Sequence, residues 1–446
     1  MSKYFLTATT LSMIFSSSAF AQETTSTASR ISRLEEEIAL LKRQQEVTEE
    51  KNKSAAEKSA NVEFGKKGLK ISSPDKNYEL SLRGTFQFDG RQFVSDKNNT
   101  GKDDFLARRL RPTLEGKAGN ASFRFMPDYA GSTTRTFDAH ADYKLNESAQ
   151  FRFGKFKTPI SLERWQSSAD LTFVERGHPS NLAPNRDVGF MVYGNPLPDV
   201  LEYQIGVFNG NQDLGNTDND DDDKKDIAAR IFAQPFRNSD IVSLQGFGAG
   251  VGGSIGDREG STTTRILGTY KSPGQQDFFR YRSDTYADGK HWRLYPQAYW
   301  YVGSLGVIAE YAISNQEVTR GATHDTLQHK AWQLATSYVL TGEDLNFRGG
   351  VKPFNDFDPS KGNLGAWEVA ARIGATDVDN KSFTTFADST VAASKASSLG
   401  VGVNWYLNEN LKLMADYDYT KFDGGATDNT DQPDEQAILT RAQFRF

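Results

Sequence analysis

Three absences in this sequence of 446 residues each exclude a class of protein. There is no cysteine, which excludes a disulfide framework and a thiolate-based site. The net charge of −6 leaves no overall basic field, so no nucleic acid is predicted as a partner. Beyond the N-terminus, no uncharged apolar run reaches the roughly 20 residues that a membrane-spanning helix requires.

The residues that are abundant favour strands and turns. The chain has 30 Phe, 17 Tyr and 38 Gly, whereas only 37% of its residues are hydrophobic, which is low for one soluble core of this size. Aromatic residues are frequent in strands and glycine is frequent in turns. The composition therefore indicates an all-β protein.

Residues 1–21 have the pattern of a secretory signal peptide. Lys3 is followed by an apolar stretch and then by Ala19-Phe20-Ala21, a cleavage site of the A-x-A type. Because the apolar stretch is too short to span a membrane as a helix, we predict cleavage after Ala21 and export of the mature chain.

Residues 22–60 have a helical period. Ile31, Leu34, Ile38 and Leu41 fall at a/d heptad spacing, with Glu and Lys on the flanks. We predict a periplasmic coiled coil that joins subunits, and a polar, partly helical tail is the alternative. Residues 61–74 are predicted to be a linker.

From residue 75 to residue 446, apolar residues alternate with polar ones. In WEVAARIGA, Trp367, Val369 and Ile373 share one face, and Glu368 and Arg372 share the other. Such segments run for about 9–12 residues, the length that a tilted strand needs to cross a bilayer. Only a closed barrel satisfies the backbone of every strand in lipid. We predict a transmembrane antiparallel β-barrel of about 16 strands, an even number as in other outer-membrane barrels.

The connections between these segments are alternately short and long. LNES (145–148), TGED (341–344) and LNEN (407–410) predict tight turns, whereas 210–226 and 377–394 predict long loops. This asymmetry is typical of outer-membrane barrels. Residues 158–187 contain no convincing strand, and we predict that they fold into the barrel and narrow it. A soluble sandwich or propeller is the alternative, but no repeated turn signature supports a propeller.

Several segments resemble the phosphate-selective porins of the O/P type. They are ELSLRGTFQFDGR, FLARRLRPTLEGKAG, RTFDAHADYKL, FRFGKFKTPISLE, FVERG, LGAWEVAARIG, LGVNWYLNENLKLMADY and the closing TRAQFRF. The resemblance covers about residues 75–446, and the combination of motifs is specific. It implies a trimeric sixteen-stranded barrel in which an arginine ladder leads to a narrow anion-binding zone.

The matching motifs also imply individual site residues. ARRLR places Arg108 and Arg109 on the arginine pair of the family, and FDAHADY places Asp138 on the acidic residue of its constriction. Arg111 and Lys157 depart from the family, which has aromatic or acidic side chains there, so this constriction is expected to be more basic. The implied anion site comprises Arg109, Arg111, Asp138, Arg152, Lys157, Arg164 and Arg176.

Strand parity gives an independent prediction. In ARRLRPT, Arg109 and Arg111 share a face, and Arg108 lies on the other. An arginine that faces lipid at mid-depth costs about 2–4 kcal/mol, so Arg108 is expected near an interface, at a subunit contact, or re-aimed by a bulge. Gly154 is expected to carry a bulge that turns Lys155 and Lys157 inward.

Other candidate chemistries are less specific. FFRYRSD offers Arg280 and Arg282 as further rungs of the arginine ladder. The acidic run 218–226 could hold a divalent cation but lacks the glycine of a calcium loop. GHPSN brings His178 and Ser180 too close in sequence for a base and nucleophile to face each other on one strand. We predict no enzyme activity, no cofactor and no metal.

The sequence as a whole predicts a porin in the outer membrane of a Gram-negative cell. It is expected to be a passive channel for anions, phosphate or polyphosphate foremost, because arginine binds phosphate bidentately and rings of charge select ions by sign. A homotrimer in contact with outer-membrane lipid and lipopolysaccharide is expected. One alternative is a weakly selective porin whose cations are neutralised by Asp128, Asp138, Glu163 and Glu175. Another is a structural tether that acts through the 27–58 helix.

Overall fold

The structure is a computed structural model that describes residues 27–95 and 101–446. The chain divides into two units, Met1–Ser59 and Ala60–Phe446. The predicted signal peptide lies outside the described residues. Within the described ranges, no helix is long and apolar enough to cross a membrane.

The first unit contains one helix, α1 (Thr27–Lys58). The four residues of the predicted heptad seam are exposed, with exposed fractions from 52% for Ile31 and Ile38 to 60% for Leu41. The described part of this helix therefore leaves its apolar residues uncovered.

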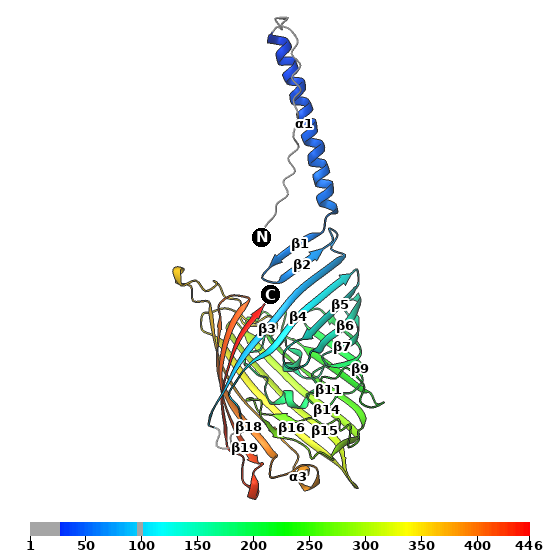
Figure 1. The fold of residues 1–446 in the computed structure, drawn as a ribbon, viewed down its shortest axis with the longest axis vertical. Helices are drawn as coiled ribbons and strands as arrows, with labels where there is room; N and C mark the ends of the chain where they lie inside the picture. The colour runs from blue at the N-terminus through cyan, green and yellow to red at the C-terminus, as the bar shows by residue number, and fades with distance from the viewer. Residues whose placement is uncertain (1–26, 96–100) are drawn as a thin grey trace. The chain divides into compact units, whose positions relative to one another are not determined.

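Sixteen strands of the second unit close into an antiparallel barrel (Figure 1). Each strand pairs with the next, and β20 pairs with β3 to close the ring. The strands are β3 (Tyr78–Ser95), β4 (Asp104–Ala118), β5 (Ala121–Asp128), β6 (Arg135–Asn146), β7 (Ala149–Phe156), β8 (Asp187–Leu197), β9 (Leu201–Phe208), β10 (Asp226–Ala233), β11 (Phe247–Glu259), β14 (Tyr286–Val302), β15 (Leu305–Arg320), β16 (Thr323–Val339), β17 (Ala366–Asp377), β18 (Ala393–Tyr406), β19 (Leu411–Gly424) and β20 (Glu435–Arg445).

The prediction of a linker over 61–74 is wrong. Strands β1 (Asn61–Gly65) and β2 (Gly68–Ser72) form a hairpin, and β2 pairs with β3 next to the point where β20 ends. The apolar residues of NVEF and LKIS alternate on either side of a tight turn, which ends at Gly68 with a φ of +88°. Such a turn favours glycine because positive φ strains other residues.

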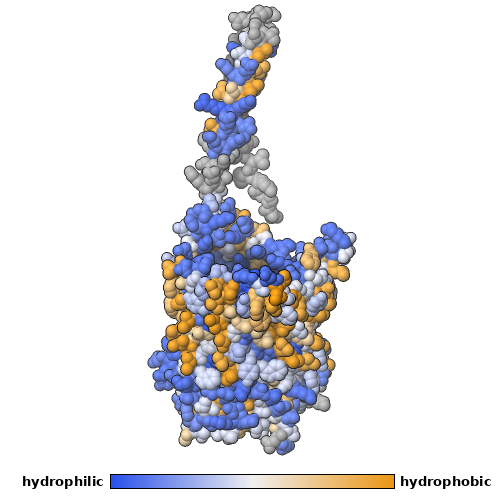
Figure 2. Space-filling view, turned by 180° about the vertical axis from the view of Figure 1, so that it is seen from behind, coloured by the Kyte–Doolittle hydropathy of each residue, from blue (hydrophilic) through white to orange (hydrophobic). Residues whose placement is uncertain are grey.

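The two faces of the strands have the predicted polarity. On β17, Val369 and Ile373 are exposed on the outside, whereas Glu368 and Arg372 are buried inside. The same alternation closes the chain, since Phe444 is exposed and Arg441 is buried. On the face seen in Figure 2, apolar residues are gathered in a band between two polar ends of the barrel. This band is what a lipid-facing surface requires.

The connections confirm some of the predicted loops and correct others. Long loops cover 209–225 and 378–392, close to the predicted ranges. TGED is not a tight turn, because it opens the long connection 340–365 between β16 and β17. FFRYRSD is not a barrel strand either: it contributes only the short β13 (Asp277–Phe279), which pairs with β12 (Tyr270–Lys271) within the long loop 260–285. The connections at the end of the barrel that holds the C-terminus are mostly short, which makes that end periplasmic.

Much of the barrel interior is filled by an apolar core. Ile160 and Leu182 of the connection 157–186 pack with Phe279 of loop 260–285 and with Tyr295 and Leu327 of the wall. All five residues are less than 2% exposed. Phe156 of this core also lines a charged cavity beside strands β3 to β7.

Candidate functional site

The connection 157–186, here called the constriction loop, follows the inner wall of the barrel. Its backbone is hydrogen-bonded to inward side chains of strands β14, β15, β17 to β20 and β3, and β16 reaches the loop through Gln333, which donates to the Glu163 side chain at 3.1 Å. Gln297 donates to Ile160 O at 2.7 Å, and Glu310 accepts from Leu162 N at 2.7 Å. Further side chains that bond to the loop backbone are Arg372, Asn404, Asp416, Lys412, Gln443 and Gln87. The predicted inward fold of this region is thus built from the polar face of the barrel.

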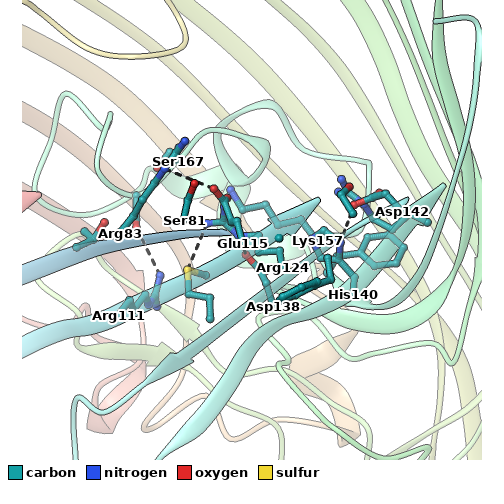
Figure 3. Close-up of a pocket in the computed structure, with 18 of the residues that line it drawn as sticks. Ser81, Arg83, Arg111, Glu115, Arg124, Asp138, His140, Asp142, Lys157 and Ser167 are labelled. Atoms are coloured by element: carbon teal, nitrogen blue, oxygen red, sulfur yellow. Dashed lines mark hydrogen bonds and ion pairs between the residues drawn. The ribbon is translucent and has the colours of Figure 1, made fainter. Parts of the chain in front are cut away.

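A cavity of about 670 Å³ lies between the constriction loop and strands β3 to β7 (Figure 3). Its lining is strongly charged, with nine basic side chains against five carboxylates. The basic residues are Lys70, Arg83, Arg111, Lys117, Arg124, Arg152, Lys157, Arg186 and Arg348. The carboxylates are Glu79, Glu115, Asp138, Asp142 and Asp170. The surplus of basic groups gives the cavity a positive potential that favours anions.

Four of the seven predicted site residues line this cavity. They are Arg111, Asp138, Arg152 and Lys157. Arg109, Arg164 and Arg176 do not line it, and each of them bonds to other groups of the protein. The cavity also includes Arg186 of the constriction loop and Arg124 of β5.

Most arginines of the cavity are paired with carboxylates. Asp138 accepts from Arg124 Nε and from Arg186 Nε, both at 3.1 Å. Arg152 Nε donates to Asp142 at 2.6 Å. Such charge-assisted bonds hold the guanidinium groups in place while they neutralise part of the charge. Figure 3 shows Arg124 and Asp138 together beside Lys157.

Three basic residues of the constriction loop have no carboxylate partner within 4.0 Å among the described residues. Lys157 Nζ donates to Trp165 O at 3.0 Å and to Gln166 O at 2.8 Å. Arg176 donates to Gln166 O at 3.0 Å, and Arg164 donates to Ser180 O at 2.8 Å. Carbonyl oxygens orient a cation without cancelling its charge. The positive charge that no carboxylate offsets is therefore concentrated on these three side chains of the constriction loop.

The helix α2 (Leu162–Trp165) positions two of these cations. Ser161 caps the helix and accepts from Arg164 N at 3.3 Å, a typical N-cap bond. The helix ends at Trp165, and the carbonyls of its last turn accept the Lys157 ammonium. Burial lowers the pKa of Lys157 well below that of an ordinary lysine, and Arg186 and Arg176 lower it further.

Phe137 lies between two arginines of the cavity. The Cζ of Arg111 is 3.7 Å from the ring centroid and the Cζ of Arg186 is 5.1 Å from it. Arg111 is also fixed by Asp128, whose Oδ2 accepts from Arg111 Nε at 2.7 Å. The β5–β6 register shifts between Met126 and Pro127, and this shift leaves Phe137 as the extra residue of a bulge. Strand parity alone could not have found this residue.

Arg108 is re-aimed by a bulge, one of the three arrangements expected. Gln87 pairs with Arg109 and Phe88 pairs with Ala107, so Arg108 is the extra residue of β4. It turns inward and donates to Glu175 of the constriction loop at 2.5 Å. Arg109 also points inward, but it bonds to Gln87 Oε1 at 2.5 Å rather than lining the cavity.

Gly154 does not carry the predicted bulge. The β6–β7 and β7–β8 ladders run through it without a register shift. Its φ is +118°, and a Cβ on this residue would lie 2.3 Å from Ala139 O, which explains why glycine stands there. Lys157 reaches the cavity because β7 ends at Phe156, and Lys155 instead pairs with Asp218 of loop 209–225 at 2.5 Å.

Other candidates from the sequence also have different surroundings. Arg282 lies in loop 260–285 and pairs with Asp388 at 3.1 Å, so it is not a rung on a barrel strand. His178 bonds through its two ring nitrogens to Thr376 and Ser398, both at 2.9 Å, and not to Ser180. No base and nucleophile are paired in this motif.

A family model decides the classification of the chain. The model of phosphate-selective porin O and P matches residues 80–446. The chain belongs to this family. It is therefore an outer-membrane porin that prefers anions. A curated relative, Porin O of Pseudomonas aeruginosa, is 25% identical over 85% of this chain and 91% of its own length.

Solved structures of outer-membrane channels share the fold of this porin. The channel DcaP of Acinetobacter baumannii has a TM-score of 0.54 at 13% identity, with 83% of this chain and 98% of that chain covered. An anion-selective porin from Comamonas acidovorans has a TM-score of 0.52 at 12% identity, with 83% and 100% covered. At these identities the likeness supports the barrel fold alone.

Proposed function

We propose that this porin is a passive, trimeric channel for inorganic anions, with phosphate and short polyphosphates as its main substrates. The observation that carries the proposal is the group of three loop cations, Lys157, Arg164 and Arg176, that bond to carbonyl oxygens and to no carboxylate. An anion that enters the cavity meets Lys157 without having to displace a competing acid, while Arg164 and Arg176 add positive charge to the loop without lining the cavity. Porin O, its relative, belongs to a family described as phosphate-selective.

The arginine–carboxylate pairs supply the sites along the path. Arginine presents two parallel N–H donors that fit phosphate, so Arg111, Arg152 and Arg186 can each exchange a carboxylate for a permeant anion. The carboxylate competes for the same donors, which keeps each site moderate in affinity. Several moderate sites in series let an ion enter and also leave.

The trimer rests on a second observation, the exposed heptad seam of α1. Other copies of the same helix would bury such a seam, and a trimer form is named for one solved porin with this fold, OmpT of Vibrio cholerae. Export through a signal peptide removed after Ala21 completes the proposal, and N-terminal sequencing of the mature protein tests it.

A planar bilayer experiment tests the channel function. Single-channel currents are measured across a KCl gradient and then with millimolar phosphate. The proposal expects a reversal potential on the anion side and a block of the chloride current by phosphate. A weakly selective reversal potential without phosphate block would instead support the general porin, in which the acids of the cavity cancel its cations.

A further inference from the structure

A second cavity adjoins the first at the periplasmic end of the barrel. Its volume is about 650 Å³, and Tyr299, Tyr301 and Phe232 are among its lining residues. Phe347 and Arg348 line both cavities. These two residues belong to the connection 340–365, here called the periplasmic segment, and they form part of the boundary between the two spaces.

The backbone on both sides of Arg348 is anchored. Phe347 O accepts from Gln166 of the constriction loop at 3.1 Å, and its ring stacks on Tyr299 with centroids 5.0 Å apart. Gly349 N donates to Asp170 of the same loop at 3.2 Å, and Gly349 O accepts from Arg445 at 2.9 Å. The segment thus holds Arg348 at a fixed place under the constriction loop.

The side chain of Arg348 has fewer anchors than its backbone. It donates to both carboxylate oxygens of Glu202 at 2.8 and 2.9 Å, yet it is 63% exposed. Exposed ion pairs of this kind are weak, because water screens the charges. Glu202 also lies 3.6 Å from Arg230, whose side chain is 1% exposed. If the Arg348 guanidinium moves away, Glu202 still has the buried Arg230 as a basic partner.

We propose that Arg348 is an exchangeable cation on the anion path, at the boundary between the two cavities, and sets phosphate selectivity toward the periplasmic exit. Its guanidinium alternates between Glu202 and a phosphate-type anion, and in leaving Glu202 it opens the boundary between the two cavities. The proposal rests on the anion-channel function. Arg230 lowers the free-energy cost of this exchange, because Glu202 has a basic partner whether Arg348 binds it or binds the anion.

The absence of cysteine allows a clean chemical test in the full mature chain. Arg348→Cys is expected to weaken phosphate block of the chloride current by about fivefold, the effect of about 1 kcal/mol for one charge at contact distance in water. Reaction with a trimethylammonium-bearing methanethiosulfonate restores the positive charge and should restore the block. The sulfonate-bearing reagent adds a negative charge and should not.

A matched control is Lys352→Cys, which removes an exposed cation from the same segment. It should leave the block unchanged before and after both reagents. Equal block in Arg348→Cys and the wild type, or equal effects of the two reagents at position 348, would overturn the proposal. Heat-dependent migration of the folded barrel on gels checks that each variant is folded.

Glu202→Gln gives an independent measurement. It removes the competitor of Arg348 while Arg348 remains, so phosphate block should strengthen. A weakening of block, as in Arg348→Cys, would mean that the ion pair only braces the segment, and would contradict the exchange. The wild-type reversal potential and block report on the channel function separately, so a failure there is distinguishable from a failure at Arg348.

Discussion

Arg108 of strand β4 and Glu175 of the constriction loop form a two-bonded ion pair, with Nε to Oε1 at 2.5 Å and Nη2 to Oε2 at 3.1 Å. Arg91 of β3 and Arg441 of β20 lie 3.6 and 3.8 Å from the same carboxylate. Glu175 is 4% exposed, so these attractions are poorly screened. One carboxylate therefore ties the loop to the strands on both sides of the barrel closure.

Glu175→Gln should loosen the constriction loop. Removing one partner of a buried ion pair costs about 3–5 kcal/mol, because the remaining charges lose their compensation. We expect a lower urea midpoint in lipid vesicles and more frequent current fluctuations in single channels. The control is Glu147→Gln, since the exposed pair of Glu147 with Lys144 should contribute only about 0–1 kcal/mol. Equal midpoints for the two variants would contradict the anchoring role.

The same carboxylate predicts how the loop responds to acid. Burial alone would raise the pKa of Glu175, but Arg108, Arg109 and Arg441 hold it well below its usual range. A carboxyl with a depressed folded-state pKa stabilises the fold above its unfolded pKa, and this stability is lost only as the pH falls toward the folded value. The wild-type loop should therefore resist added protease equally at pH 7 and pH 5. Cleavage that already increases at pH 5 would show that Glu175 is not held ionised.

Arg111 tests whether a paired arginine of the cavity binds the permeant anion. Arg111→Gln leaves Asp128 without its partner and should shift the reversal potential toward cations. The double variant Arg111→Gln/Asp128→Asn removes a neutral pair and should restore the reversal potential. If Arg111 contacts phosphate directly, the double variant should still show weakened phosphate block. Normal block in the double variant would assign Arg111 to the neutralised wall charges.

The heptad seam of α1 tests the trimer. Leu34→Asn/Ile38→Asn places polar side chains at two neighbouring core positions, which should destabilise helix association. We expect the trimer band on semi-native gels to disappear at a lower temperature, while single-channel conductance is retained. Gln45→Asn, at a poor seam position, is the control. An unchanged trimer band in the double variant would place the subunit contact in the barrel alone.

Alternation of residues predicted the barrel well because each strand must satisfy lipid on one face and polar surroundings on the other. The exceptions are places where the alternation breaks. Arg108 and Phe137 are extra residues of bulges, and a bulge depends on the pairing with the neighbouring strand. The sequence also does not show which carboxylate pairs with each cation, because the partner can be near or distant in sequence. Arg111 pairs with Asp128, 17 residues away, whereas Lys155 pairs with Asp218, 63 residues away. The resemblance located the constriction, whereas only the structure separates its paired from its unpaired cations.

Lys157 lines the cavity and has no carboxylate within 4.0 Å, and because it is less exposed than Lys117, the other such cation of the described lining, it should dominate the anion preference. Lys157→Gln should shift the reversal potential toward cations, whereas Lys361→Gln, which removes an exposed cation far along the chain, should not. Burial and the nearby arginines lower the pKa of Lys157, so its charge should be lost at a lower pH than that of an ordinary lysine. Anion selectivity of the wild type should therefore decline as the pH rises, before the range in which an ordinary lysine loses its charge. Lys157→Arg keeps its charge at all accessible pH values and should abolish the decline, because arginine is not deprotonated in proteins. The same decline in Lys157→Arg as in the wild type would assign the titration to another group.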